Sequence, residues 1–256
     1  MVKAPEKFQR VQIVSRVDHT DDLWSIRIQP ENRLVFKPGQ YATLGVEDGE
    51  KLTERAYSIV SSPLEGQLEF FIELVPVGQL TPPLYQLQVG DTLWMRRQAK
   101  GLFTLDAKSG HRKHFMAATV TGIAPYLSTV RTLARETENG NPPNLEIVVL
   151  HAASRTQELA YGDELQAYAQ RYPWVRYIPM VSRPWEEPEW KGETGRMEDV
   201  LRKYLDALDL HPAETTAYLC GHPQMIENAK GIMRRRGFSK EFVREEVYWL
   251  SRKEAS

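Results

Sequence analysis

The chain has 256 residues, 41% of them hydrophobic and 26% charged, with a formal net charge of −1. This length is enough for two domains with separate cores, and the near-neutral charge gives no global field that would draw the protein to nucleic acid or a membrane. A single cysteine, Cys220, excludes a disulfide within the chain and an iron–sulfur cluster held by cysteines.

The sequence carries no sign of export or membrane insertion. No apolar run approaches the length of a membrane span, and the start of the chain lacks the apolar core of a signal peptide. We therefore expect a cytoplasmic protein.

The first hundred residues predict a series of short strands. Apolar and polar residues alternate over roughly five to eight positions at a time, and Pro38-Gly39 and Asp48-Gly49 mark turns. The strands are predicted at residues 11–17, 23–28, 40–46, 57–62, 68–75 and 92–97. Because closing a sheet removes its exposed edges, this series predicts a small antiparallel β-barrel.

One short helix is predicted within this half, at residues 81–87. Thr81 is a favourable N-cap, and Pro82 suits the first helical turn. Unpaired backbone N–H groups at a helix N-terminus attract anions, so one interpretation is a bound pyrophosphate with Arg55 opposite. The other is a capped surface helix that binds nothing.

The most informative segment of this half is Arg55-Ala56-Tyr57-Ser58. In a strand, Arg55 and Tyr57 would point to one face and Ser58 to the other. A guanidinium binds phosphate in a bidentate fashion, a phenol ring stacks on a flat ring, and a hydroxyl donates to a ring heteroatom. Together these groups suit a flavin nucleotide. A strand with Arg and Tyr facing solvent is the alternative.

Beyond a polar, basic linker at residues 107–114, the pattern changes to alternating strands and helices. Strands are predicted at residues 114–119, 145–150, 175–181, 216–220 and 243–248, and helices at residues 125–138, 158–171, 197–208 and 223–236. This alternation predicts a parallel sheet covered by helices, which binds ligands at the carboxyl ends of its strands.

Three arginines follow predicted strands of the second half. Arg155, Arg183 and Arg196 would suit an extra phosphate on a ribose, and the alternative for each is a solvated surface residue. The sequence lacks a G-x-G-x-x-G fingerprint, which argues against the ordinary Rossmann mode of dinucleotide binding.

Two glycine-containing turns, Thr121-Gly122 and Cys220-Gly221, also follow predicted strands. Each allows a ligand to approach the backbone closely. Cys220 is expected either as an apolar packing residue or as a soft sulfur against a nicotinamide ring, and not as a nucleophile, because no base is identifiable. His222 has no second ligand at a suitable spacing, so we expect no metal site.

Two further features allow two interpretations each. The aromatic pair Tyr248-Trp249 either caps the core or forms a stacking lid over an exposed ring. Basic clusters at residues 96–97, 111–114 and 234–236 are either solvated faces or a docking patch for an acidic protein.

In their order and spacing these segments resemble the ferredoxin–NADP⁺ reductase family, in particular its bacterial ferredoxin/flavodoxin reductases. The resemblance covers nearly the whole chain and rests on residues 55–58, 78–81, 101–106, 121–128, 158–161, 181–183, 194–196 and 220–225. It implies an N-terminal antiparallel Greek-key β-barrel for FAD at residues 1–107 and a C-terminal α/β parallel-sheet domain for NADP(H) at residues 112–256. Electrons would be exchanged at the cleft between the two.

The same resemblance implies roles for individual residues. Tyr57 would stack on the isoalloxazine ring of FAD, Ser58 would lie near its reactive nitrogen, and Cys220 would abut the nicotinamide; these are the predicted catalytic residues. FAD would be bound by Arg55, Ala56, Tyr57, Ser58, Phe71, Ile72, Gln79, Leu80, Thr81, Thr121, Tyr248 and Trp249. NADP(H) would be bound by Ser154, Arg155, Ser182, Arg183, Arg196, Gly221 and Pro223, with Arg183 and Arg196 on the 2′-phosphate.

Three positions depart from the pattern of the family. Val120 stands where the family's Gly-Thr-Gly begins with glycine, which implies a differently shaped turn. Ser154 stands where bacterial relatives often have arginine, and Arg155 follows one residue later. The chain continues beyond Trp249 to Ser256, so the aromatic pair is not terminal.

The resemblance thus implies an FAD-dependent enzyme that exchanges hydride with NADP(H) and single electrons with ferredoxin or flavodoxin, an acidic electron carrier. It would act as a monomer without nucleic-acid, membrane or metal partners. The alternatives are the reductase component of an oxygenase and a free-flavin reductase. A non-catalytic flavin- and NADP-binding module is the alternative of another class, and Val120 keeps it open.

Overall fold

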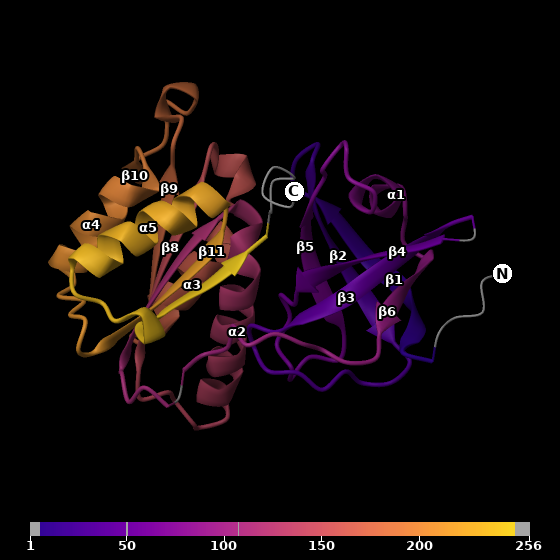
Figure 1. The fold of residues 1–256 in the computed structure, drawn as a ribbon, viewed down its shortest axis with the longest axis horizontal. Helices are drawn as coiled ribbons and strands as arrows, with labels where there is room; N and C mark the ends of the chain where they lie inside the picture. Colours follow the sequence, from indigo (N-terminus) through magenta and orange to yellow (C-terminus); the bar gives the residue numbers. More distant parts are fainter. Residues whose placement is uncertain (1–5, 50, 107, 249–256) are drawn as a thin grey trace. The chain divides into compact units, whose positions relative to one another are not determined.

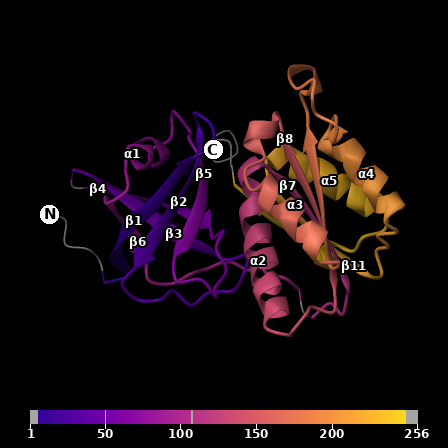
Figure 2. The same ribbon diagram turned by 180° about the vertical axis from the view of Figure 1, so that it is seen from behind.

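The computed structural model describes residues 6–49, 51–106 and 108–248 (Figures 1 and 2). The contacts within it divide the chain into two compact units. The first comprises Met1–Leu105 and Ala124–Arg135, and the second comprises Asp106–Ile123 and Glu136–Ser256. The predicted domain boundaries, residues 1–107 and 112–256, stay a prediction, because this grouping also assigns the helix at 124–135 to the first unit.

The first unit contains a six-stranded antiparallel sheet in the order β4-β3-β6-β1-β2-β5. Its strands are β1 (Phe8–Asp18), β2 (Leu23–Pro30), β3 (Tyr41–Asp48), β4 (Lys51–Ser58), β5 (Leu68–Glu73) and β6 (Thr92–Arg96). The two outer strands meet beyond the end of β4, where Ile59 forms a bridge with Phe70 and the Val60 N–H donates to the Glu69 carbonyl at 2.8 Å. The sheet therefore curls round on itself, which confirms the predicted antiparallel barrel.

The inward faces of these strands form the core of the barrel. Trp24, Ile28, Phe70 and Met95 are fully buried in one apolar cluster. Burying a large apolar side chain stabilises a fold by about 1.5–3 kcal/mol relative to leaving it exposed. This cluster holds the barrel together, and the polar side chains of the outer faces remain available for other contacts.

The strand predicted at residues 57–62 is wrong. Strand β4 instead occupies Lys51–Ser58 and pairs with β3 along its whole length, from Asp48↔Lys51 to Tyr41↔Ser58. The turn at Gly49, whose φ is +61°, sets this register. The strand has only a weak sequence signal because it lies at the edge of the sheet and most of its side chains are at least partly exposed, so no apolar alternation appears.

Helix α1 (Thr81–Tyr85) is shorter than predicted and starts differently. Leu80, not Thr81, occupies the N-cap position, so the predicted cap is wrong. The Thr81 hydroxyl accepts from the Val75 N–H at 2.9 Å and donates to the Val75 carbonyl at 3.1 Å. Thr81 therefore closes the loop from β5 to α1, because both hydrogen-bonding groups of Val75 lie within its reach.

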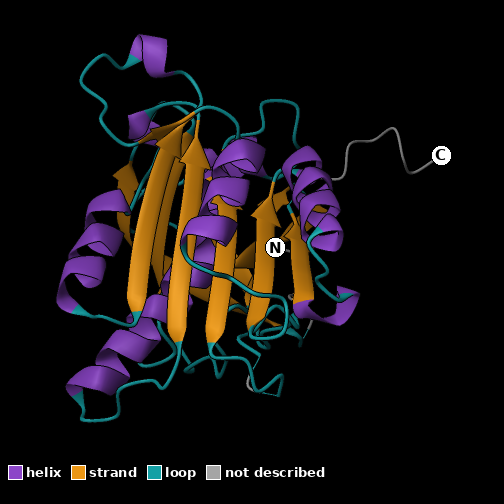
Figure 3. Ribbon diagram, turned by 90° about the vertical axis from the view of Figure 1, so that its left-hand side faces the viewer, coloured by secondary structure: helices purple, strands orange, loops and turns teal. Residues whose placement is uncertain are grey.

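The second unit contains a six-stranded parallel sheet in the order β10-β9-β8-β7-β11-β12 (Figure 3). Its strands are β7 (Lys113–Thr119), β8 (Glu146–Ala153), β9 (Val175–Val181), β10 (Glu193–Thr194), β11 (Thr215–Gly221) and β12 (Val243–Val247). The chain runs from β7 to β10 on one side and then returns to β11 on the other side of β7. This reversal makes the carboxyl ends of β7 and β11 the topological switch point of the sheet.

Three helices of this unit are α3 (Gly162–Arg171), α4 (Met197–Ala207) and α5 (Pro223–Arg235). Leu201 of α4 and Ile226 of α5 are fully buried in one apolar cluster with residues of the sheet. Helix α3 begins four residues later than predicted, because a short 3₁₀ turn (Thr156–Glu158) precedes it and Tyr161 takes a left-handed backbone with φ +66°. Within the described residues, no helix is long and apolar enough to cross a membrane.

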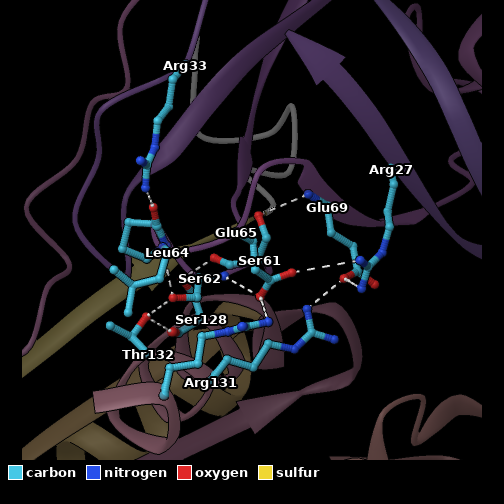
Figure 4. A network of polar contacts seen from close by, with 12 residues as sticks. Arg27, Arg33, Ser61, Ser62, Leu64, Glu65, Glu69, Ser128, Arg131 and Thr132 are labelled. Atoms are coloured by element: carbon cyan, nitrogen blue, oxygen red, sulfur yellow. Dashed lines mark hydrogen bonds and ion pairs between the residues drawn. The ribbon is translucent and has the colours of Figure 1, made fainter. Parts of the chain in front are cut away.

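Helix α2 (Ala124–Glu138) is linked to the barrel by polar side chains (Figure 4). The Ser128 hydroxyl donates to the Ser61 carbonyl at 2.7 Å, and the Thr132 hydroxyl donates to that of Ser62 at 2.8 Å. All four side chains are buried. These bonds satisfy polar groups that burial would otherwise leave unpaired, so they fix the helix against the segment that follows β4.

A buried carboxylate lies in the same network (Figure 4). Glu69 of β5 accepts from Arg131 Nη1 at 2.6 Å and from Arg27 Nη2 at 2.9 Å. The side chains of Glu69 and Arg131 are only 6% and 7% exposed. A buried carboxylate is costly unless it is paired and hydrogen-bonded, and the two arginines supply these partners to Glu69 under helix α2.

This arrangement predicts different effects for two arginines of the same helix. Arg131→Ala leaves the Glu69 carboxylate buried with one partner fewer, and we expect it to lower the free energy of unfolding by about 3 kcal/mol. Arg135→Ala removes a 48% exposed side chain 3.7 Å from Glu65 and should cost less than about 1 kcal/mol. Urea unfolding measures both, and equal losses would contradict the proposed role of the buried pair.

Candidate functional site

The first candidate site lies at the end of β4. Arg55 and Ala56 are exposed, Tyr57 is half-buried and Ser58 is buried. The Arg55 guanidinium donates to the Glu54 carbonyl at 2.7 Å, and its positive charge acts on the Tyr57 phenol. Burial raises the pKa of Tyr57, and this effect outweighs the opposing effect of Arg55, so the phenol keeps its proton at neutral pH.

Strand β5 brings a further predicted residue to this place. The bridge between Ile59 and Phe70 sets the end of β4 beside Phe71, which is 4% exposed and whose ring meets that of His19 edge-on at 5.3 Å. Ile72 is 1% exposed and belongs to the apolar cluster of the barrel. The Ile72 side chain therefore packs in the core of the barrel, and only the Ile72 backbone could contact a ligand.

The remaining predicted residues of this unit lie around the start of α1. Gln79 is exposed, Leu80 is buried and Thr81 is half-buried and bonded to Val75. The end of β4 thus offers an exposed guanidinium, a neutral phenol ring and a hydroxyl within four residues. These groups suit a flat ring that carries phosphate.

The second candidate site lies at the switch point of the parallel sheet. A Cβ atom on Gly122 would lie 2.5 Å from the Cys220 carbonyl oxygen, and one on Gly221 would lie 2.2 Å from Thr119 Oγ1. Gly221 also has φ +121°, a conformation that favours glycine. Both positions therefore require glycine, because the turns after β7 and β11 touch through their backbones.

Val120 takes an unusual conformation in the first of these turns. Its φ is +42°, in the left-handed region that β-branched residues avoid. His151 Nε2 lies 3.0 Å from the Val120 carbonyl oxygen, and His151 Nδ1 lies 3.2 Å from the Tyr177 hydroxyl. Because a carbonyl only accepts, Nε2 carries the proton, and Nδ1 accepts from Tyr177.

The buried imidazole of His151 therefore holds the turn in place. Burial lowers the pKa of His151 to about 4, against the smaller raising effect of its bond to Val120. The ring is neutral at pH 7, which is the state that donates through one nitrogen and accepts through the other. A strained backbone of this kind costs about 1–3 kcal/mol and persists where its surroundings fix it.

These values predict a pH dependence of stability. Burial lowers the pKa of His114 to about 4 as well, whereas a histidine in an unfolded chain titrates near ~6.5. Between these values the unfolded chain binds more protons than the folded one, so each histidine's contribution is complete above about pH 6.5 and is lost as the pH falls toward 4. Each should contribute on the order of 3 kcal/mol.

NMR titration of the histidine ring protons measures this directly. We expect the two buried rings to titrate far below the same residues in concentrated urea, where the chain is unfolded. If the His151 ring of the folded protein titrated near ~6.5, its role as a neutral donor to Val120 would be wrong.

Three further predicted residues lie at the switch point of the parallel sheet, namely Thr121, Cys220 and Pro223. Cys220 is fully buried, and burial raises the pKa of its thiol. The Tyr248 N–H donates to the Gly221 carbonyl at 3.4 Å. Thr121 and Pro223 are half-buried, and Pro223 opens helix α5. Trp249 lies outside the described residues. The contact of Cys220 with a reacting ring stays a prediction.

The third group of predicted residues lies at the ends of β8 and β9. Ser154 and Arg155 follow β8, while Ser182 and Arg183 follow β9 and extend the pairing, since the Arg183 N–H donates to the Ser154 carbonyl at 3.1 Å. The structure brings Arg155 and Arg183 together around one carboxylate. Glu186 Oε2 lies 2.6 Å from Arg155 Nε, and Glu186 Oε1 lies 3.7 Å from Arg183 Nη1.

Arg196 has different neighbours. It is exposed at the N-cap of α4. There it lines a surface hollow of about 360 Å³ between α4 and α5, which also contains Arg202 and Arg235. Because β10 pairs with the end of β9, Arg196 lies at the same carboxyl edge of the sheet as Arg155 and Arg183. Glu186, however, pairs with Arg155 and Arg183.

Sequence reasoning missed several residues of these sites. Tyr177 appears only as a member of an apolar strand, and His151 directly follows the strand predicted at residues 145–150. Nothing in their spacing links them to Val120. Glu186, Glu187 and Glu189 lie within six residues of Arg183, so their charge could have been noticed as a partner for the arginines. Among the described residues, no group of three histidine, cysteine or acidic side chains is placed to hold a metal ion.

Known proteins match both units. The family model of the oxidoreductase FAD-binding domain matches residues 10–103, and that of the oxidoreductase NAD-binding domain matches residues 116–231. Ferredoxin–NADP reductase A of Sorangium cellulosum is 32% identical over 247 residues, which cover 90% of this chain and 84% of that protein. The flavodoxin/ferredoxin–NADP reductase of Escherichia coli is 33% identical over 219 residues, or 82% of this chain and 84% of that protein.

A solved structure matches nearly the whole chain. The ferredoxin NADP⁺ reductase of Neisseria gonorrhoeae, determined with bound FAD and NADP, superimposes with a TM-score of 0.83 at 25% identity. The match covers 96% of this chain and 100% of that one. The likeness therefore extends over both units and is not confined to one domain.

Proposed function

This chain belongs to the ferredoxin–NADP reductase family, and from that membership we propose that it is an FAD-dependent oxidoreductase that exchanges hydride with NADP(H) and single electrons with a ferredoxin or flavodoxin. The observation that carries the proposal is the set of groups at the end of β4. Arg55, Tyr57 and Ser58 lie at the end of β4, which meets β5 at the bridge between Ile59 and Phe70, within the part of the chain that matches an FAD-binding domain.

On the barrel, three residues of β4 would make different contacts with the cofactor. The exposed Arg55 holds a phosphate of the cofactor through charge and bidentate donation. Tyr57 supplies a flat, neutral face for stacking, and Ser58 offers a hydroxyl to a ring heteroatom. Bound FAD supplies the chemistry, because a flavin takes up two electrons together and releases them one at a time.

On the parallel sheet, backbone and arginine groups bind the nicotinamide nucleotide. The two central turns carry no side chain at Gly122 and Gly221, so a ligand can approach the backbone closely at these positions. Helix α5 begins at Pro223 directly after the second turn, and its N-terminal N–H groups favour an anionic ligand. Arg155 and Arg183 at the neighbouring strand ends suit the phosphate on the ribose.

The proposed protein partner is an acidic electron carrier. Arg97, Arg234 and Arg235 are exposed, whereas Arg96 is paired with Glu54 and Arg236 with Asp206. One arginine in each of these two basic clusters is thus paired within the chain, and Arg97, Arg234 and Arg235 are left to attract a negatively charged surface.

Anaerobic stopped-flow reduction tests the proposed function. The purified protein is mixed with NADPH and, separately, with NADH while the flavin absorbance near ~450 nm is followed. We expect a yellow protein that NADPH bleaches rapidly. A colourless protein, or a flavin that neither nucleotide reduces, would remove the proposed activity and favour a binding module without turnover.

Substitution of the arginines tests the nucleotide site. Arg183→Ala and Arg196→Ala should each weaken NADPH binding about tenfold, because each removes one cation from the 2′-phosphate, and should leave NADH binding nearly unchanged. Steady-state kinetics with both nucleotides measure the difference. Equal losses with NADPH and NADH would assign the two arginines to something other than the 2′-phosphate.

A further inference from the structure

Hydrogen-bond donors at Ser154 and Thr156, on either side of Arg155, already have acidic partners. The Ser154 N–H donates to Glu158 Oε2 at 2.9 Å, and the Thr156 N–H donates to Glu187 Oε1 at 3.0 Å. The Thr156 hydroxyl donates to the second oxygen of Glu187 at 2.9 Å. Backbone and hydroxyl donors at the end of β8 are therefore bound to carboxylates of this chain.

The two arginines are occupied in the same way. Glu186 lies between Arg155 and Arg183, with one carboxylate oxygen near each guanidinium, at 2.6 and 3.7 Å. Arg155 also lies 3.6 Å from Glu158. Two carboxylates thus pair with the two guanidinium groups, and they offset part of the positive charge that would attract a second phosphate on the nucleotide.

The loop that carries these acids is anchored at both ends. The 3₁₀ turn Pro184–Glu186 begins at Arg183, where the Glu186 N–H donates to the Arg183 carbonyl at 3.0 Å. Further along, Trp190 packs against a small apolar cluster that contains Val181, and its indole N–H donates to the Glu193 carbonyl at 2.9 Å. The Glu186 carboxylate is held beside the arginines by these contacts.

We propose that Glu186 is a specificity-determining residue, an internal carboxylate that competes with the 2′-phosphate of NADP(H) for Arg155 and Arg183. The inference rests on the proposed function and adds a residue that sequence patterns did not suggest. A carboxylate and a phosphate oxygen pair offer a guanidinium the same kind of bidentate acceptor. NADP(H) must displace Glu186 from both arginines, whereas NAD(H), which lacks the 2′-phosphate, can bind without doing so.

The solvent exposure of the Arg155–Glu186 ion pair determines how strongly Glu186 competes with the 2′-phosphate. The side chains of Arg155 and Glu186 are 43% and 34% exposed, and ion pairs this open are weak and screened by salt. A phosphate can therefore displace the carboxylate. The wild-type protein still binds the 2′-phosphate, but it discriminates less between the two nucleotides than two unpaired arginines would allow.

The test compares two glutamines introduced into one loop. Glu186→Gln removes the competing charge, and Glu189→Gln removes an exposed charge three residues away as a matched control. Isothermal titration calorimetry measures the binding of 2′-phospho-AMP and of AMP to the FAD-loaded wild type and to both variants. Near-UV circular dichroism checks that the fold is unchanged.

We expect Glu186→Gln to bind 2′-phospho-AMP about fivefold more tightly than the wild type at low salt, with AMP binding unchanged. Glu189→Gln should bind both nucleotides as the wild type does. The proposal is overturned if Glu186→Gln shows no gain, if AMP gains equally, or if Glu189→Gln gives the same gain, which would indicate a general field effect. These outcomes leave the proposed function intact, whereas a wild type that binds neither nucleotide would overturn both.

Discussion

The backbone contact between the two central turns of the parallel sheet constrains the rest of the second unit. The turns after β7 and β11 approach so closely that Gly122 and Gly221 have no room for a side chain. The order in which the chain adds strands to the sheet reverses between β7 and β11, and this reversal leaves an opening at the carboxyl ends of these two strands. The turn before Gly122 is forced into a left-handed conformation at Val120, and the buried His151 fixes it there by a hydrogen bond.

Two carboxylates, each between two arginines, illustrate how burial decides the role of an ion pair. Glu69 is enclosed between helix α2 and the barrel, where losing a partner leaves a charge without solvent. Glu186 sits between Arg155 and Arg183 in contact with water, where ion pairs are weak and screened by salt. The first pair therefore stabilises the fold. The second is weak enough to yield to a ligand, which is what a selectivity device requires.

Much of the fold could be predicted from the sequence. Alternating apolar residues located most strands of the barrel, and the apolar run at residues 175–181 is a strand over the predicted residues. The prediction failed where local pattern and tertiary contact disagree. Strand β4 is an edge strand whose mixed burial conceals its period, and Thr81 bonds to Val75 across a loop instead of capping its own helix.

The sequence by itself determined the residue types of the candidate sites and their order along the chain. Arg55, Tyr57 and Ser58 are adjacent in the sequence, so their association needs no tertiary contact. Only the tertiary structure decided which distant groups meet. His151 reaches Val120 across the sheet, and Glu186 lies between Arg155 and Arg183, because pairing between parallel strands brings their carboxyl ends to one edge. Local pattern carries no information on the pairing of His151 with Val120 or of Glu186 with Arg155, since strands and helices separate these residues along the chain.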